Sequence, residues 1–327
     1  MMNELDVESV FMKGGKFYKG NLHSHTHLSD GALPPDEVVR LYKAAGYAFL
    51  GISDHNRYFN TTEYDTDDFI LIPAIEWSVR EPKDGIKGHH IHGIWGTDEM
   101  IRQAGDRVMP HLQTYKPWVW EGPGTVQRCV DTLRDAGNLA IYNHPVWSRL
   151  EMEDLLRTEF FGLEIFNYGC DIEDATSLST LYWDQLLRRG RKVYGFASDD
   201  SHFGGESKPG DPYYCAFGGW IVVIAKELTR EALAEAMLRG SFYSSTGPEI
   251  LDYQVEGEEI VIRCSPVSRI NFIAYERRGR VFLARDGETI TEARYPMYGD
   301  ETFVRVECID ERGRTAWTNP IFVKDWY

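Results

Sequence analysis

The chain has 327 residues, of which 43% are hydrophobic, and its 51 acidic and 35 basic side chains give a formal charge of −16. This length and apolar content indicate one large folded domain plus a smaller one, and they exclude a disordered or low-complexity protein. The acidic excess and the lack of a basic stripe exclude extended nucleic-acid binding, although a short oligonucleotide end could enter a locally cationic pocket.

The cysteines and the N-terminus bear on the compartment. The five cysteines are scattered and never form a CxxC pair, which favours small buried residues in a reducing environment over a disulfide framework or a zinc knuckle. Residues 1–15 lack the features of a signal peptide, and no run of about 18 apolar residues could span a bilayer. We therefore expect a cytoplasmic protein without a membrane partner. No feature of the sequence specifies an oligomeric state.

The stretch 21–31, NLHSHTHLSDG, follows a strand predicted over residues 15–22. On a strand, side chains two positions apart point the same way, so His23 and His25 can reach one ion. Asp30 lies in the following loop and can turn back toward the same cavity. A solvated strand end is the plainer interpretation, but Asp30 nearby favours a metal site. His27 is expected to be a surface or wall residue.

The remainder of the first 245 residues repeats one order of elements: a strand, a polar terminus, then a helix. Strands are predicted over 47–52, 69–75, 139–142, 162–166, 192–197 and 220–225, and helices over 35–45, 125–136, 151–160, 178–189 and 229–239. This repetition indicates a parallel α/β barrel or sheet, in which reactive side chains collect at the carboxyl ends of strands.

Nine possible metal ligands stand at or just past predicted strand ends. They are His23, His25, Asp30, His55, Glu76, His90, His144, Asp200 and His202. Nine nitrogen and oxygen donors are too many for one four-coordinate zinc, and they fit two or three ions that share bridging carboxylates. Of these residues, Glu76, Asp200 and His202 are also our candidates for the catalytic group.

Glu76 and one histidine of the HHIHGIW segment are candidate ligands for different reasons. Glu76 follows an almost continuous apolar run, where a lone buried carboxylate is costly unless it is paired or bound to a cation. In HHIHGIW, strand alternation puts His90 and His92 on one face and His89 on the other. We choose His90 as the ligand and leave His92 open as the alternative.

Other polar residues at these strand ends have a plainer interpretation. His144 in YNHP is held extended by the following proline, and by itself it would be an ordinary loop histidine as readily as a ligand. Asp54 and Asp199 each precede a candidate ligand, and we interpret both as capping or orienting partners.

The pattern changes after residue 249. Apolar and polar residues alternate between glycine and aspartate turns, which is typical of antiparallel strands. We expect a β-sandwich accessory domain over residues 246–327, after a hydrolase domain over residues 1–245. The accessory domain has no histidine, so its expected role is structural or substrate-shaping.

The ordered motifs NLHSHTHLSDG, SDHN, PAIE, GHHIHG, NHP and DSH resemble those of the polymerase and histidinol phosphatase (PHP) superfamily of metal-dependent phosphoesterases. The C-terminal part, with STGPEI and AWTNPIFV, is similar to the branch that includes carbamate-insecticide hydrolases. The resemblance implies a distorted (β/α)7 barrel with three divalent ions, which could be zinc, manganese or iron. It implies three ligand sets: His23, His25, Glu76 and Asp200; Glu76, His90 and His144; and Asp30, His55 and His202.

The chemistry that follows is hydrolysis of a phosphate ester by a metal-activated water, with a small phosphorylated metabolite or nucleotide as substrate. Candidate substrate contacts, each closely following a ligand motif, are Asn56, Arg57, Arg80 and Arg149; an ordinary surface charge is the plainer interpretation of each. The same site could cleave a carboxylic ester, amide or carbamate, with tryptophans lining an apolar pocket. A third alternative is a non-catalytic, metal-stabilised binding protein.

Overall fold

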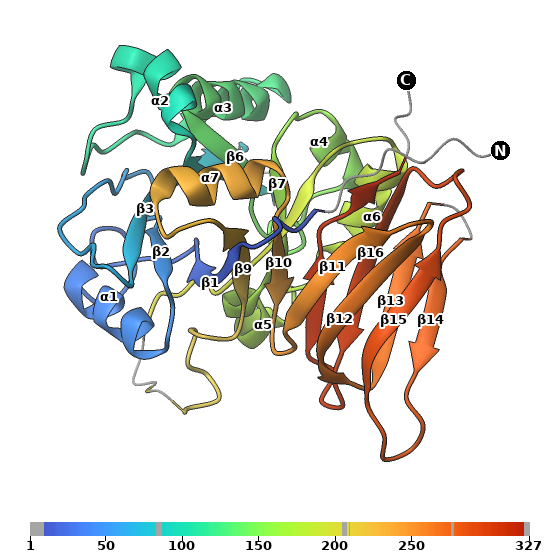
Figure 1. The fold of residues 1–327 in the computed structure, drawn as a ribbon. Helices are drawn as coiled ribbons and strands as arrows, with labels where there is room; N and C mark the ends of the chain where they lie inside the picture. The colour runs from blue at the N-terminus through green and yellow to red at the C-terminus, as the bar shows by residue number, and fades with distance from the viewer. Residues whose placement is uncertain (1–9, 83–86, 205–207, 209, 276–277, 324–327) are drawn as a thin grey trace.

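The computed structural model describes residues 10–82, 87–204, 208, 210–275 and 278–323 (Figure 1). Residues 1–9 of the expected hydrolase domain and residues 324–327 of the expected β-sandwich domain lie outside this range. The described chain is a mixed α/β protein, which confirms the class expected from sequence. No helix in these residues is long and apolar enough to cross a membrane.

Seven neighbouring strands carry the site. In spatial order they are β1 (Lys16–Asn21), β2 (Phe49–Ile52), β3 (Ile70–Arg80), β4 (Gly88–Trp95), β6 (Asn138–Tyr142), β7 (Gly162–Asn167) and β8 (Tyr194–Ser198). The strands β1 to β3 are parallel, as are β6 to β8, but β4 runs antiparallel to both of its neighbours. The sheet is therefore mixed, which corrects the expectation of a purely parallel one.

The sheet does not close into a barrel through backbone hydrogen bonds between its described strands. Strand β9 (Trp220–Ala225) pairs antiparallel with β1 and with β10 (Phe242–Ser245). Among the described strands, no backbone ladder joins β8 to β9. A side chain links the edges instead, because Ser244 Oγ on β10 donates a hydrogen bond to the carbonyl oxygen of Gly195 on β8, at 2.9 Å. The closed seven-fold barrel implied by the resemblance is therefore not confirmed.

The helices lie around this sheet (Figure 1). They are α1 (Pro35–Ala44), α2 (Asp98–Ala104), α3 (Gly124–Asp135), α4 (Met152–Leu156), α5 (Tyr168–Asp174), α6 (Thr180–Arg188) and α7 (Arg230–Leu238). Helix α1 shows why the sequence folds locally as predicted: a proline and two acidic residues occupy its first turn, and Gly46 follows its end with φ +80°. The short helices α2 and α5 were not expected from the sequence.

Strand β3 is longer than the sequence indicated. The prediction ended this strand at Glu76, but β3 continues to Arg80, so Glu76 lies inside the strand. The reason is the antiparallel partner β4, which pairs Glu76 with His92 and Arg80 with Gly88. Glu76 is a polar residue after an apolar run, a pattern that indicates a strand end. The strand nevertheless continues, because β4 supplies backbone hydrogen bonds beyond Glu76.

The C-terminal part forms two packed sheets. One layer continues the large sheet, because β10 pairs with β17 (Thr315–Thr318), followed by β16 (Phe303–Ile309), β13 (Arg269–Ala274) and β14 (Arg280–Leu283). The other layer consists of β11 (Ile250–Glu256), β12 (Glu259–Val267) and β15 (Ile290–Pro296). A buried core that includes Tyr253, Phe272 and Tyr295 fills the space between them. The alternating pattern thus gave two layers, one of which is continuous with the sheet that carries the site.

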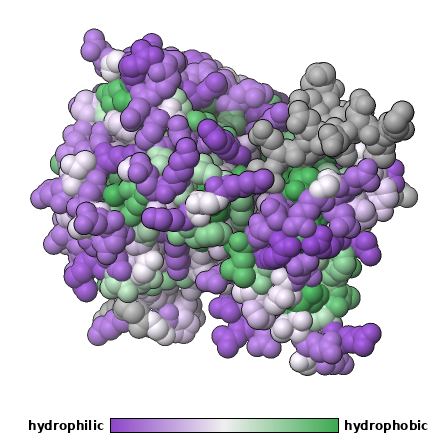
Figure 2. Space-filling view, viewed as in Figure 1, coloured by the Kyte–Doolittle hydropathy of each residue, from purple (hydrophilic) through white to green (hydrophobic). Residues whose placement is uncertain are grey.

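Viewed from the same side as in Figure 1, most of the protein surface is hydrophilic, with hydrophobic residues in small separate groups (Figure 2). This distribution agrees with the large share of charged residues, 26% of the chain.

We predict that Gly51→Ala destabilises the protein by about 1–3 kcal/mol, because overpacking a filled core has this cost. A Cβ atom at Gly51 would lie 2.8 Å from the carbonyl oxygen and 3.1 Å from the Cα atom of Leu22, which are backbone atoms that cannot rotate away. Gly88→Ala is the matched control, since its Cβ would meet nothing within 4 Å. Urea unfolding measures both variants, and equal midpoints would show that β1 and β2 tolerate a wider spacing.

Candidate metal centre

The carboxylate of Glu76 is the centre of the site. It is fully buried and faces the rings of five histidines at N–O distances of 3.0–3.4 Å. These residues are His23, His25, His55, His90 and His144. They come from the ends of β1, β2 and β6 and from β4, so the neighbouring strands deliver side chains that are far apart in sequence.

Asp200 completes the most buried group. It follows β8, and its Oδ1 lies 3.1 Å from His23 Nε2 and 3.0 Å from His25 Nε2. With Glu76, these residues could hold one ion, since their donor atoms lie within 4.8 Å of one another. Asp200 has φ +53°, an uncommon conformation for a residue other than glycine, and such backbone strain concentrates at functional sites.

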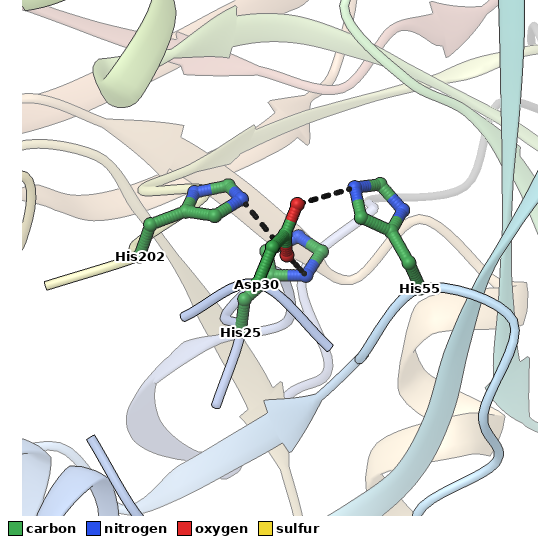
Figure 3. Close-up of side chains that lie close together, drawn as sticks. All are labelled: His25, Asp30, His55 and His202. Carbon is green, nitrogen blue, oxygen red and sulfur yellow. Dashed lines mark ion pairs between the residues drawn. The ribbon is translucent and has the colours of Figure 1, made fainter. Parts of the chain in front are cut away.

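A second group surrounds Asp30 and is more open. In Figure 3 the rings of His25, His55 and His202 surround the Asp30 carboxylate. The shortest N–O distances are 3.4 Å to His55 and to His202 and 3.5 Å to His25. The side chain of Asp30 is 53% exposed. This group contains the predicted set of Asp30, His55 and His202, with His25 added.

A third group joins His55, Glu76 and His90. The resemblance implied His144 rather than His55 in this set. His144 does approach Glu76, with its Nε2 3.1 Å from Oε1. The structure therefore brings all nine predicted donors into one cluster, in which His25, His55 and Glu76 are shared between groups.

The neighbours of His90 in the HHIHGIW segment lie elsewhere. His92 is on the same face of β4 but is buried beside Asn143 and the ring of His23. Burial lowers the pKa of His92 to about 3. His89 is on the opposite face, where its Nδ1 contacts the hydroxyl of Tyr142 at 2.5 Å. Of the three, His90 is the one in direct contact with Glu76, at 3.2 Å.

Buried polar atoms without hydrogen-bond partners indicate whether the cluster fits a cation. Six buried side-chain atoms here lack a hydrogen-bond partner among the described residues: His23 Nε2, His25 Nε2, His55 Nδ1, Glu76 Oε2, His90 Nδ1 and Asp200 Oδ1. An unsatisfied buried polar atom costs about 1–3 kcal/mol, so this concentration of them is unfavourable unless another group satisfies it. Mixed imidazole and carboxylate donors suit zinc, manganese or iron, and the residues therefore fit divalent ions.

The pKa values of several side chains in the cluster are shifted far from their usual values. Burial by itself would lower the pKa of His25, but Asp200 and Glu76 raise it to about 10. Burial by itself would raise the pKa of Glu76, but His23 and His90 hold it well below its usual value. For His55, burial prevails and lowers the pKa to about 4. Since metal-binding histidines must be deprotonated, metal binding at this cluster is coupled to proton release.

Two buried carboxylates hold the loops that carry ligands. Asp54 accepts hydrogen bonds from the backbone N–H and hydroxyl of Thr26 and from the hydroxyl of Ser29, at 2.7–2.8 Å, and so orders the loop before Asp30. Asp199 accepts a hydrogen bond from the hydroxyl of Tyr42 and from three backbone N–H groups over residues 217–219. Burial raises the pKa of Asp199 to about 6.

A third buried carboxylate of this kind, Glu164 on β7, was not expected from the sequence. It is buried, and its Oε1 lies 2.8 Å from His23 Nδ1. The signal was present: Glu164 interrupts the apolar run GLEIF, and the argument that singled out Glu76 applies equally to it.

Two adjoining cavities open onto the cluster. The inner one, of about 280 Å³, is lined by metal-group residues together with Trp147, Cys170 and Glu173. The outer one, of about 880 Å³, shares Asp30, His55, His90 and Trp147 with it. The ligand cluster is therefore at the bottom of a cleft with room for a substrate of metabolite size.

Three of the four predicted substrate contacts line the outer cavity: Asn56, Arg80 and Arg149. Arg57 is not among its lining residues. Arg149 forms an ion pair with Asp174 at 3.4 Å. Arg80 makes no ion pair with any described residue.

No protein-family model matches the sequence, and no curated protein matches it. Among solved structures, the chain is similar to a two-domain protein from Bacteroides vulgatus that contains a proposed PHP-like metal-dependent phosphoesterase, with 13% identity, a TM-score of 0.48 and coverage of 95% of both chains. It is also similar to a proposed metal-dependent phosphoesterase from Bifidobacterium adolescentis, with 15% identity, a TM-score of 0.38 and coverage of 58% of this chain and 89% of that one. A third structure, an amidohydrolase from Chromobacterium violaceum with bound sulfate and no metal, shows 18% identity, a TM-score of 0.39 and coverage of 57% and 88%.

We predict that zinc or manganese raises the thermal stability of chelator-treated protein, because an ion that binds only the folded state adds about 2.7 kcal/mol at a hundredfold excess over its Kd. Glu76→Gln keeps the side-chain volume but removes the shared charge, so its midpoint should respond far less to the ion. Glu292→Gln, in the C-terminal sheet β15, is the control and should respond as the wild type does. A wild-type midpoint that does not change at saturating ion would rule out a folded-state metal site.

Proposed function

We propose that this chain is a metal-dependent hydrolase of the PHP class that cleaves small phosphate esters. The observation that carries the proposal is the convergence of nine nitrogen and oxygen donors, six with unpaired buried atoms, at the bottom of an open cleft. We propose the ligands His23, His25, Asp30, His55, Glu76, His90, His144, Asp200 and His202, which would hold two or three ions of zinc, manganese or iron.

Each part of the cleft has a distinct task in this proposal. Divalent ions at such a site supply a water of lowered pKa and neutralise the charge that develops on the phosphoryl oxygens. Glu76 and Asp200 fix the buried group, whereas Asp30 and His202 present the more exposed group toward the incoming ester. The buried His23 and His25 close the bottom of the cleft to bulk water.

Arg80 is the proposed contact for the anionic or polar part of the substrate. It ends β3 at the wall of the outer cavity, and the pairing of β3 with β4 fixes its backbone opposite Gly88. A guanidinium presents several N–H donors in a planar fork that matches phosphate or carboxylate oxygens. Asn56 and Arg149 would assist, although Asn56 Oδ1 already accepts a hydrogen bond from the backbone N–H of Ser78.

One observation favours a second candidate, hydrolysis of a carboxylic ester, amide or carbamate. Trp147 lines both cavities, and its ring lies 4.9 Å from that of His144 and 5.8 Å from that of His90. Its side chain is 36% exposed. An apolar ring beside the ligands suits a neutral aryl substrate, whose carbonyl carbon would be the electrophile attacked by the same water.

The panel that tests both candidates contains nucleoside monophosphates, sugar phosphates, short oligonucleotides, aryl carboxylic esters and an aryl carbamate, assayed with metal-loaded protein. We expect phosphate release from one of the phosphate esters and its loss in Asp200→Ala, because that variant lacks a carboxylate of the most buried group. A melting curve shows whether the variant is folded. Cleavage of the carbamate alone would favour the second candidate, and no turnover with ions bound would leave a binding protein.

Arg80→Ala is expected to lower kcat/KM for a phosphate ester by about tenfold or more, since a charge-assisted hydrogen bond is worth roughly 1.5–3 kcal/mol. Arg128→Ala is the matched control: Arg128 is exposed on α3 and paired with Glu121 at 2.6 Å. Equal kcat/KM for the two variants would remove Arg80 from the substrate site.

A further inference from the structure

Below the ligands, the buried carboxylate of Glu164 on β7 connects several of the segments that carry them. Its Oε1 faces His23 Nδ1 at 2.8 Å and accepts a hydrogen bond from the hydroxyl of Ser198. Its Oε2 accepts hydrogen bonds from the backbone N–H of His144, at 2.8 Å, and from Asn167 Nδ2, at 3.0 Å. All four partners of this carboxylate come from segments at the ends of β1, β6, β7 and β8.

The direction of these hydrogen bonds is fixed by the groups around Glu164. A backbone N–H can only donate. The amide of Asn167 is oriented by the N–H of Cys170, which donates to Asn167 Oδ1 at 2.8 Å, so its Nδ2 is turned to Glu164 and to Asp200 Oδ2. Two obligate donors therefore meet Oε2, and that position must be occupied by an acceptor.

The Oε1 side sets the tautomer of His23. A carboxylate accepts hydrogen bonds only, so His23 Nδ1 must carry a proton, and when the ring is neutral, as metal binding requires, the lone pair is on Nε2. That Nε2 atom is buried, has no hydrogen-bond partner among the described residues and faces Asp200 Oδ1 at 3.1 Å. The hydrogen bond from Nδ1 thus aims the metal-binding atom of His23 into the most buried group.

We propose that Glu164 is a positioning residue that holds His23 in its metal-binding tautomer and so sets the ion affinity of the group formed by His23, His25, Glu76 and Asp200. This inference rests on the proposed function, in which that group holds an ion. Glu164 touches neither an ion nor the substrate in this scheme. It acts through His23, and secondarily through Asn167 on the orientation of Asp200.

Glu164→Gln gives a sharp test, because an amide of the same shape cannot satisfy both sides as a carboxylate does. The donors from His144 and Asn167 require the amide oxygen at the Oε2 position. The amide NH2 must then occupy the Oε1 position and donate to His23 Nδ1, which moves the imidazole proton to Nε2. The variant should therefore lose the lone pair that binds the ion, although its volume hardly changes.

We expect Glu164→Gln to weaken zinc binding by about 10- to 100-fold, as measured by calorimetric titration of chelator-treated protein. The charge-matched control is Glu173→Gln. Glu173 lines the same inner cavity but is exposed, and it makes no hydrogen bond or ion pair with a described metal-group residue. Its substitution should change the affinity by less than about threefold. Equal weakening in both variants would reduce the role of Glu164 to its charge, and wild-type affinity in Glu164→Gln would overturn the inference.

A second measurement uses the wild-type protein, so that the inference stays testable if Glu164→Gln does not fold. In ¹⁵N-labelled, zinc-loaded protein, the Nδ1 of His23 should be protonated and its Nε2 should be the zinc-bound nitrogen. A protonated Nε2, or no zinc binding at all, would overturn the inference. Both readouts are independent of turnover, so a protein that binds zinc through His23 yet cleaves nothing would contradict the proposed function alone.

Discussion

The burial of the Glu76 carboxylate in the middle of a strand is the constraint on which the site depends. An isolated ionised carboxylate in a sheet interior is strongly unfavourable, and the structure surrounds this one with five imidazole rings at 3.0–3.4 Å. Four of those rings, of His23, His25, His55 and His90, each leave one nitrogen atom without a hydrogen-bond partner among the described residues. Glu76 Oε2 also lacks a partner, and a divalent cation would satisfy both the carboxylate and these rings.

The polar atoms of the site fall into two sets. Six atoms of the proposed ligands lack hydrogen-bond partners within the described chain, whereas the carboxylates behind the ligands have them in full. Asp54, Asp199 and Glu164 each accept at least three hydrogen bonds from backbone N–H groups or side chains. Six of the unsatisfied buried atoms thus gather where an ion would bind, and the supporting carboxylates orient the residues around that place.

The reversed strand β4 brings two residues to the outer cavity. Because β4 is antiparallel to β3, its first residues lie beside the last residues of β3, and Arg80 and His90 both line that cavity. The C-terminal sheets attach on another side, through the pairing of β10 with β17. Buried polar contacts secure that junction: Asn319 Nδ2 donates to the carbonyl oxygens of Gly240 and Phe242, and the guanidinium of Arg305 lies 4.7 Å from the ring of Trp183.

The sequence by itself determined what depends on neighbouring residues. Hydrophobic period, glycine stops and proline starts gave the main helices and strands to within a few residues, and polar residues after apolar runs picked out the donors that the structure brings together. It could not determine the direction of β4, the true end of β3, or the sharing of His55 between two groups. The sequence pattern of a strand is the same whether its partner strand is parallel or antiparallel, because the two-residue alternation of side chains shows only which face of the sheet each one occupies. It also could not connect Glu164 with His23, which is 141 positions away. Only the tertiary structure decided these features, because a buried charge is tolerated or not according to the partners that distant strands bring to it.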